Sequence, residues 1–220
     1  MKIEIFSDIA CPWCYIAKRR LEHALETFEH RDEVEIVWRS FELAPDMPSR
    51  VPYTTAEELI HVKGVAPSEA QKMIDNVTRL GASLGLDMRF DILKLFNTRK
   101  AHELVHHAKT LGKQAEMKER LFRANFTEGR ELGDVDVLVE TAADIGLNPV
   151  DAREALETDR YRDAVIADEQ RAQSSGAQSV PYIVFDGKQA LFGAKRTEVL
   201  RAMLEQVWQE EHAPEASSST

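Results

Sequence analysis

The chain has two cysteines, Cys11 and Cys14, and the residues between them are Pro12 and Trp13. The motif lies where a short apolar run, residues 3–6, gives way to a helical pattern. A strand followed by Cys-x-x-Cys at the start of a helix is typical of a redox-active pair, in which two thiols and a disulfide interconvert.

The position of the motif explains why such sulfurs would be reactive. A helix N-terminus carries about half a positive charge and several free N–H groups, so it stabilises a thiolate, the nucleophile of disulfide exchange. Pro12 fits the first helical turn, where a missing N–H has no cost. We therefore predict that Cys11 attacks, that Cys14 resolves and closes the disulfide with Cys11, and that Pro12 and Trp13 tune the pair.

Three other interpretations of the two cysteines remain. A structural zinc site needs four ligands, and the chain has no second cysteine pair, so we expect no metal. Free cysteines are often just small buried apolar residues, but Pro and Trp between them fit that role poorly. A structural disulfide is disfavoured in a reducing compartment.

Composition and charge exclude some classes of partner. The 220 residues are 43% hydrophobic and 30% charged, as in a soluble globular protein with a substantial core. The net charge of -10 argues against nucleic acid and against an anionic membrane surface. Glu4 interrupts the first apolar run too early for a signal peptide, and no stretch approaches the ~20 apolar residues of a membrane span. We expect a cytoplasmic protein.

The N-terminal pattern predicts a strand, a helix and a second strand. Ile3 and Ile5 alternate with polar neighbours, and residues 34–38 alternate again. Residues 18–20 are basic, and we expect them to fall largely on the solvated side of the helix between the strands. The apolar stripe of that helix recurs at spacings of three and four: Trp13, Ile16, Ala17, Leu21, Ala24, Leu25 and Phe28.

The central part of the chain is predicted to be helical. After a stretch with several prolines, Thr54 and Glu57 fit a capping box. The last central helix is expected over about residues 159–174. Helical stripes end at glycines, the expected stop signal: Gly85, Gly112, Gly129, Gly146 and Gly176.

The C-terminal part returns to strands. Residues 180–185 are apolar and β-rich, Asp186-Gly187 is a tight-turn signal, and residues 190–192 form the return strand. An amphipathic helix follows over about residues 199–207, and the small, polar tail, residues 213–220, is expected to be disordered.

This order predicts an α/β protein, a thioredoxin fold interrupted by a large all-helical insertion domain. Residues 1–40 and 177–212 would form the discontinuous thioredoxin-like domain, and residues 41–176 the insertion. A single α/β layer fold without separable domains is the alternative.

The thioredoxin topology assigns a role to Val180-Pro181, because a cis-proline loop faces the Cys-x-x-Cys motif in that fold. We predict that Pro181 is cis and lies against Cys11. The Val180 backbone would then bind substrate by pairing with an extended strand.

The chain resembles the DsbA-like thioredoxin family, most closely its cytosolic FrnE-type branch. The similarity spans nearly the whole chain and implies dithiol–disulfide exchange through the cysteine pair. Ala17, Ser179 and Lys195 depart from residues common in the family, which bears on substrate preference more than on redox chemistry. The residues that carry the resemblance are Ser7-Asp8, Cys11 to Ile16, Lys18 to Glu22, Phe41 to Leu43, Pro45 to Pro48, Asn97-Thr98, Ala101-His102 and Val180-Pro181.

A second motif, His102-Glu103-Leu104-Val105-His106, matches the HExxH pattern of zinc proteases. Such a site needs a third ligand, and nothing in the local pattern positions Glu128, the possible candidate. We therefore interpret the motif as structural, and we expect His107 and His212 to be solvated.

The resulting hypothesis is a thiol–disulfide oxidoreductase, with client proteins or low-molecular-weight thiols as partners. It needs no cofactor, with glutathione as a possible co-substrate. One rival is a glutathione-dependent transferase or isomerase, of the kappa-class or 2-hydroxychromene-2-carboxylate isomerase type. There one activated residue near position 11 would suffice, and Asn97 would contact glutathione. The other rival is a non-enzymatic holdase. Oligomeric state and the direction of exchange are not predicted.

Overall fold

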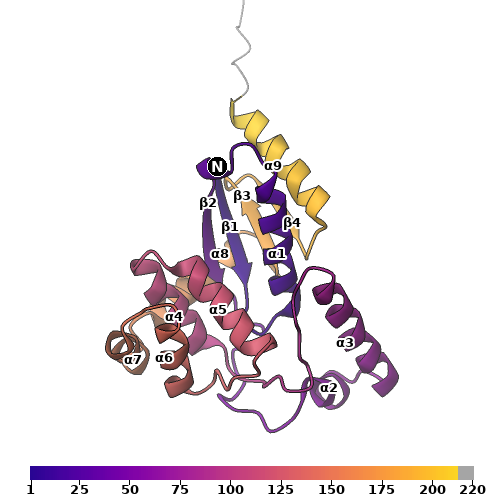
Figure 1. Ribbon diagram of the computed structural model, residues 1–220, viewed down its shortest axis with the longest axis vertical. Helices are drawn as coiled ribbons and strands as arrows, with labels where there is room; N and C mark the ends of the chain where they lie inside the picture. Colours follow the sequence, from indigo (N-terminus) through magenta and orange to yellow (C-terminus); the bar gives the residue numbers. More distant parts are fainter. Residues whose placement is uncertain (213–220) are drawn as a thin grey trace, which may run out of the picture.

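A four-stranded mixed sheet lies at the centre of the molecule (Figure 1). The computed structural model describes residues 1–212, so the predicted disordered tail lies outside the described residues. The strand order is β2-β1-β3-β4, with β1 and β2 parallel and the other neighbours antiparallel. The predicted β-α-β opening and β-β-α ending are confirmed. The strands are β1 (Lys2–Ser7), β2 (Glu35–Ser40), β3 (Tyr182–Phe185) and β4 (Gln189–Phe192).

Helices α1 (Pro12–Glu26) and α9 (Thr197–His212) pack together on one face of the sheet. Ile3 and Ile5 point to this face because side chains alternate along a strand, and they are buried in its core. Burial of such side chains stabilises the layer by roughly 1.5–3 kcal/mol for each. The same cluster includes Leu21, Ala24, Phe28, Trp38, Ile183, Phe185, Leu200, Leu204 and Val207.

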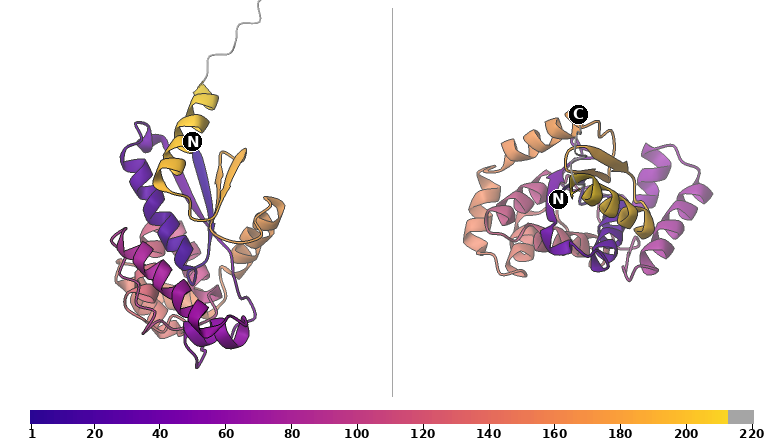
Figure 2. Two further views of the ribbon diagram at one scale, coloured as in Figure 1. Left: turned by 90° about the vertical axis from the view of Figure 1, so that its right-hand side faces the viewer. Right: turned by 90° about the horizontal axis from the view of Figure 1, so that it is seen from above.

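Helix α8 (Arg162–Ser174) lies on the opposite face (Figure 2). It packs against β2, and its Arg171 donates to Glu4. The Glu4 side chain projects from β1 on the face opposite to α1. The helix just before the predicted boundary at residue 177 is therefore in contact with the sheet. The boundaries themselves stay a prediction.

Apart from α8, the helices of the predicted insertion lie at one end of the sheet, with α4 to α7 on one side and α2 and α3 on the other (Figure 1). One buried cluster unites α4, α5, α6 and α7, and it also receives Ile9 from the loop after β1. A short 3₁₀ turn, η1 (Arg31–Glu33), precedes β2. The elements of the insertion are α2 (Thr55–Glu57), the π-helical turn η2 (Glu58–Val62), α3 (Pro67–Ala82), α4 (Arg99–Thr110), α5 (Gln114–Phe126), α6 (Val135–Ala143) and α7 (Pro149–Glu157).

The helix boundaries follow the predicted signals with one omission. Thr54 and Glu57 form the predicted capping box, and Gly112 and Gly146 adopt φ values of 71° and 76° just after α4 and α6. Helix α7 was not predicted. Its signal was available, because Asn148 caps it by accepting the Val150 amide and Pro149 occupies its first turn.

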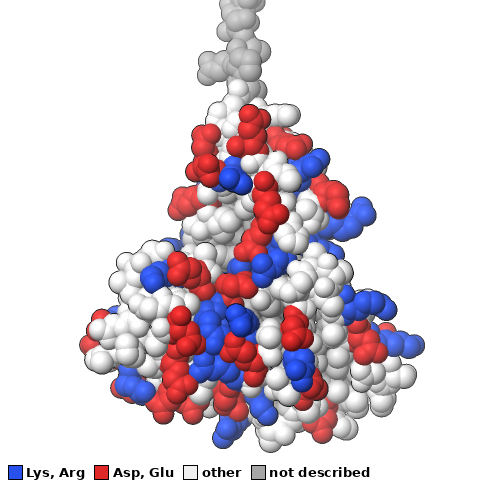
Figure 3. All heavy atoms as spheres, viewed as in Figure 1, with Lys and Arg blue, Asp and Glu red and all other residues white. Residues whose placement is uncertain are grey.

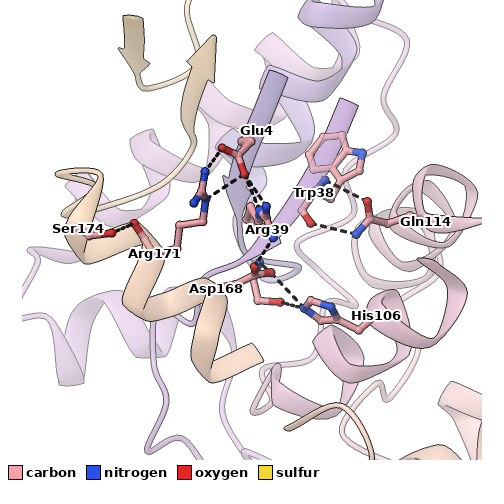
Figure 4. Close-up of polar contacts among 9 residues, drawn as sticks. Glu4, Trp38, Arg39, His106, Gln114, Asp168, Arg171 and Ser174 are labelled. Atoms are coloured by element: carbon pink, nitrogen blue, oxygen red, sulfur yellow. Dashed lines mark hydrogen bonds and ion pairs between the residues drawn. The ribbon is translucent and has the colours of Figure 1, made fainter. Parts of the chain in front are cut away.

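The outer edge of β2 is bound by a side chain from the insertion. The Gln114 amide accepts the Trp38 N–H at 3.1 Å and donates to the Trp38 carbonyl at 3.0 Å (Figure 4). Gln114 thus makes both hydrogen bonds that a neighbouring strand would make at this position.

Two predictions of surface exposure were wrong. Lys18 is buried, and its ammonium binds Glu22 and Glu119. His107 is also buried, and its ring lies beside the ring of Tyr161, the residue just before α8. On the face that Figure 3 shows, acidic and basic side chains are interspersed. In the described part of the chain, no helix is long and apolar enough to span a bilayer.

Candidate active site

Cys11 occupies the N-cap of α1, and Pro12 opens its first turn. The Cys14 backbone N–H donates to the Cys11 sulfur at 3.3 Å. The same N–H also donates to the Cys11 carbonyl at 3.1 Å, so it is shared between two acceptors of the N-cap residue. Both cysteines are free thiols, so the structure represents the reduced pair.

The two sulfurs differ from the residues between them in exposure. Cys11 is 3% exposed and Cys14 is 1% exposed, whereas Trp13 is 40% exposed. Trp13 therefore presents an apolar surface beside a nearly covered sulfur. Access to Cys11 from solvent is therefore restricted.

The Val180-Pro181 peptide bond is cis, as predicted. The Cys11 thiol donates to the Val180 carbonyl over 3.8 Å, which brings the loop and the cysteine together. Val180 precedes β3 in the chain. The paired residue of β3 nearest to it is Tyr182, which lies opposite Phe6. Its backbone is therefore outside the pairing of the sheet.

The loop between β1 and α1, residues 7–10, is held by two helices of the insertion. From α5, Lys118 donates to the Ser7 carbonyl at 3.3 Å and Asn125 donates to the Ile9 carbonyl at 3.2 Å. From α4, the His102 ring contacts the Asp8 carboxylate at 3.2 Å. We call Asp8, His102, Lys118 and Asn125 the loop cluster. The insertion thereby fixes the segment that delivers Cys11.

Asp8 and His102 form a fully buried pair. Burial alone would raise the pKa of Asp8, but hydrogen bonds from His102 and from the Leu43 amide lower it below its ordinary value. Burial lowers the pKa of His102, although its contact with Asp8 acts against that shift.

Cys14 and Lys118 are both perturbed by burial. Burial raises the pKa of the Cys14 thiol well above its ordinary value, and Cys11 acts in the same direction. Burial also lowers the pKa of Lys118 to about 8, against the attraction of nearby sulfurs and carboxylates. The Cys14 sulfur therefore resists ionisation unless a nearby group stabilises its charge.

A second group of charges binds β1 and β2 to α8 and α4 (Figure 4). Arg39 donates to Glu4 and to Asp168, each at 2.9 Å, while Arg171 donates to Glu4 at 3.0 Å. His106 lies 3.1 Å from Asp168. We call Glu4, Arg39, His106, Asp168 and Arg171 the sheet network. Each of its charged groups has an opposite partner.

The structure explains the HExxH pattern without a metal. Its two histidines contact different carboxylates, since His102 binds Asp8 and His106 binds Asp168. Glu128, the possible third ligand, binds Arg120 instead. Within residues 1–212, no group of three or more His, Cys, Asp or Glu side chains is placed to hold a metal ion.

A cavity of about 600 Å³ lies beside the cis-proline loop. Phe41 and Ala177 line it and also belong to the apolar cluster that contains Cys11. Neither the two cysteines nor Val180 and Pro181 are among the residues that line it.

Sequence reasoning found the cysteines and the proline loop but missed the roles of Asp8, His102, Lys118 and Asn125. A signal for two of them existed. Lys118 and Asn125 are seven residues apart, so they share one face of α5 with Leu121 and Phe122. Polar side chains on a mostly apolar helix face indicate buried partners.

Comparison with known proteins gives a consistent family. The family model described as a DSBA-like thioredoxin domain matches residues 2–205. A probable DsbA oxidoreductase from Streptomyces coelicolor superposes with a TM-score of 0.92 and 38% identity, over 97% of this chain and 92% of that chain. The uncharacterized protein YwbO of Bacillus subtilis is 30% identical over 162 residues, 73% of this chain and 74% of its own length.

A more distant structure shares the fold. The cytosolic disulfide reductase DsbM from Pseudomonas aeruginosa, solved with GSH, has a TM-score of 0.67 and 19% identity, over 95% of this chain and 100% of that chain. The predicted fold class and family are thereby confirmed. The FrnE-type branch stays a prediction.

Proposed function

Because this chain belongs to the DSBA-like thioredoxin domain family, we propose that it is a thiol–disulfide oxidoreductase that acts through Cys11 and Cys14. One observation carries the proposal. The Cys11 sulfur lies at the N-cap of α1, accepts the Cys14 N–H and faces the cis-proline loop.

Exchange proceeds in two displacements. The Cys11 thiolate attacks one sulfur of a substrate disulfide, forms a mixed disulfide, and expels the other substrate sulfur as a thiolate. Cys14 then attacks Cys11 and releases the second substrate thiolate, which leaves the enzyme oxidised and the substrate reduced. The reverse sequence oxidises a client dithiol. Both directions need only the two sulfurs, so the reaction needs no cofactor.

The surroundings of Cys11 suit this chemistry. The helix start and the Cys14 N–H stabilise the attacking thiolate and the same sulfur when it becomes the leaving group. The Val180 backbone, outside the sheet pairing, would hold an extended substrate beside Cys11. Pro12 fixes the first turn, and the exposed ring of Trp13 would contact the substrate.

Client proteins and low-molecular-weight thiols are the proposed partners. The GSH in the structure of DsbM supports glutathione as a co-substrate, and the cytosolic location stated for DsbM supports a cytoplasmic site of action. We propose no nucleic-acid or membrane partner, given the net charge of -10.

The decisive experiment is trapping with Cys14→Ser. This variant should hold mixed disulfides at Cys11, which mass spectrometry of adducts from lysate would identify as proteins or glutathione. The Cys11→Ser/Cys14→Ser variant is the matched control and should hold none. Cys11→Ser alone should lower exchange by about 10³-fold or more, since the nucleophile is lost.

The rival functions give different outcomes. A glutathione-dependent transferase or isomerase would keep its activity in Cys14→Ala, because it needs one activated residue only. A holdase would prevent aggregation of an unfolded client without either cysteine. Retained disulfide exchange in Cys11→Ser would contradict the proposal itself.

A further inference from the structure

Lys118 is a buried ammonium without a carboxylate partner. The side chain is 1% exposed, and within the described residues no carboxylate oxygen lies within 4.0 Å of its nitrogen. Its contacts are the Ser7 carbonyl at 3.3 Å and the rings of Trp38 and Phe122, with centroids 5.7 and 5.2 Å away. A buried charge without a counter-ion is costly, so its retention calls for a reason.

Lys118 and Cys14 share one buried neighbourhood around Phe122. The Lys118 ammonium lies 5.2 Å from the centroid of the Phe122 ring, and Phe122 and Cys14 belong to one buried cluster. Tyr15, the residue after Cys14, stacks on the same ring with centroids 4.8 Å apart. The ammonium therefore lies in the apolar surroundings of Cys14, where charges are screened little by water.

The ionisable groups around Lys118 differ in whether their charge changes during disulfide exchange. Asp8 faces it from the loop and is bound by His102 from α4, and Asp168 faces it from α8 and is bound by Arg39 and His106. The remaining groups are the two sulfurs of α1, Cys11 and Cys14. These are the groups whose charge depends on the redox step.

Building on the proposed function, we propose that Lys118 is the counter-ion of the Cys14 thiolate that resolves the mixed disulfide. Cys14 gives its proton to solvent, and its electron pair forms the bond to the Cys11 sulfur. The bond between Cys11 and the substrate sulfur breaks, and the substrate leaves as a thiolate that takes a proton from water. Lys118 holds its own proton throughout and stabilises the charge on Cys14. It acts as a positioning residue that the insertion supplies.

The ionisation behaviour of the two groups supports this assignment. Burial raises the pKa of Cys14, and the positive charge of Lys118 is one of the influences that lower it again. With a pKa of about 8, Lys118 is mostly protonated at pH 7. A neutral side chain at position 118 would remove this influence on the thiolate.

The test separates the two chemical steps in one molecule. The reduced protein is mixed with excess DTNB, whose coloured thiolate is released once when Cys11 attacks and again when Cys14 resolves. A Cys14→Ser variant assigns the first phase. Lys118→Met should slow the second release at pH 7 by about 10-fold or more, the equivalent of one pKa unit, and change the first by less than about 3-fold. Lys118→Gln, which is polar but uncharged, should show the same loss.

Lys18→Met is the matched control. Lys18 is also a buried lysine and lies one helical turn after Cys14, but its ammonium is bound by Glu22 and Glu119. Both releases should remain within about 2-fold of the wild-type rates, because a paired lysine has little charge to offer the sulfur.

The pH profile adds a readout that loss of packing would not move. The second release accelerates as Cys14 ionises, and the ratio of the wild-type rate to the Lys118→Met rate should shrink as the pH rises through about 8, because Lys118 loses its proton there. Equal slowing of both steps, or an unchanged second step, would overturn the assignment of Lys118. Wild-type protein that releases only one thiolate would instead overturn the proposed function.

Discussion

The sheet network and the loop cluster both bury charge between the sheet and the insertion, but they differ in pairing. In the sheet network Arg39 lies between Glu4 and Asp168, and every charge has an opposite neighbour. In the loop cluster Asp8 has His102, while Lys118 has only a carbonyl and two rings. The paired group fits a structural role, and the unpaired ammonium lies beside the sulfurs. The proposed role of Lys118 in the exchange depends on this difference.

Helix α4 takes part in both groups. His102 and His106 are one helical turn apart, and each reaches a different carboxylate. The HExxH spacing thus places two neighbouring contacts on one side of a helix, as the geometry of positions i and i+4 requires.

The largest expected change in stability is at Arg39, in the sheet network. Arg39→Met would leave Glu4 with Arg171 and would leave Asp168 with His106 and the Ser40 N–H. We expect the free energy of unfolding to fall by about 3–5 kcal/mol. Urea denaturation measures it. Arg50→Met, which removes an exposed ion pair with Glu131, is the control and should have no resolvable effect. A similar loss in both variants would remove the distinction between the two groups.

The opposite sign is expected at Lys118. Replacing the unpaired ammonium by methionine should raise the free energy of unfolding at pH 7 by about 1–3 kcal/mol, because burial disfavours the charged form. The folded-state pKa of Lys118 is about 8, below its ordinary value of 10.5. The free-energy cost of burying the charged Lys118 therefore applies in full below pH 8 and disappears between pH 8 and 10.5.

The stability difference between the two proteins should accordingly shrink as the pH rises through that window. A Cys14→Ser background removes the titration of the thiol from the measurement. If Lys118→Met were destabilising at pH 7, the lysine would be a structural element, and its contrast with Arg39 would disappear.

A smaller effect on stability is expected at acidic pH, from His102 of the loop cluster. The pKa of His102 is lowered by burial, so below pH 6.5 the unfolded chain takes up a proton that the folded protein refuses. Stability should fall with decreasing pH by at most about 1.4 kcal/mol per pH unit from this residue. His102→Gln should flatten the dependence between pH 6.5 and 5. Unfolding curves at several pH values test it, and an unchanged slope would contradict the neutral state of His102.

The smallest effect is expected at the uncharged contact between β2 and α5. Gln114→Ala removes two hydrogen bonds to the Trp38 backbone, which water can partly replace, so a loss of about 1 kcal/mol is expected. Thermal unfolding measures it, with Gln206→Ala in the exposed part of α9 as the control. A loss as large as that of Arg39→Met would show that charge is not what makes the sheet network stabilising.

Local patterns predicted the elements that carry the sulfurs. The position of Cys11 before Pro12 is a property of one helix start, and alternation and stop signals are local as well. The cis Val180-Pro181 bond followed from topology, which those elements define. The proposed reaction uses these parts of the chain.

What sequence reasoning missed depends on contacts between distant segments. Lys118 is 111 residues from Ser7, and its burial follows from how α5 lies against the sheet. Lys18 was predicted to be solvated because its partner Glu119 is 101 residues away. The packing of α8 on the sheet was not foreseen either, because its ion pairs with β1 and β2 are invisible in its own pattern.

Gln114 has a consequence beyond stability. A sheet edge with free N–H and C=O groups is a template on which another chain can add a strand, and repeated addition produces aggregates. Gln114, on a helix far along the chain, binds the N–H and the carbonyl of Trp38 and so blocks strand addition at this position on the outer side of β2. We expect this contact to disfavour the addition of a strand to β2, an effect that does not depend on the two sulfurs.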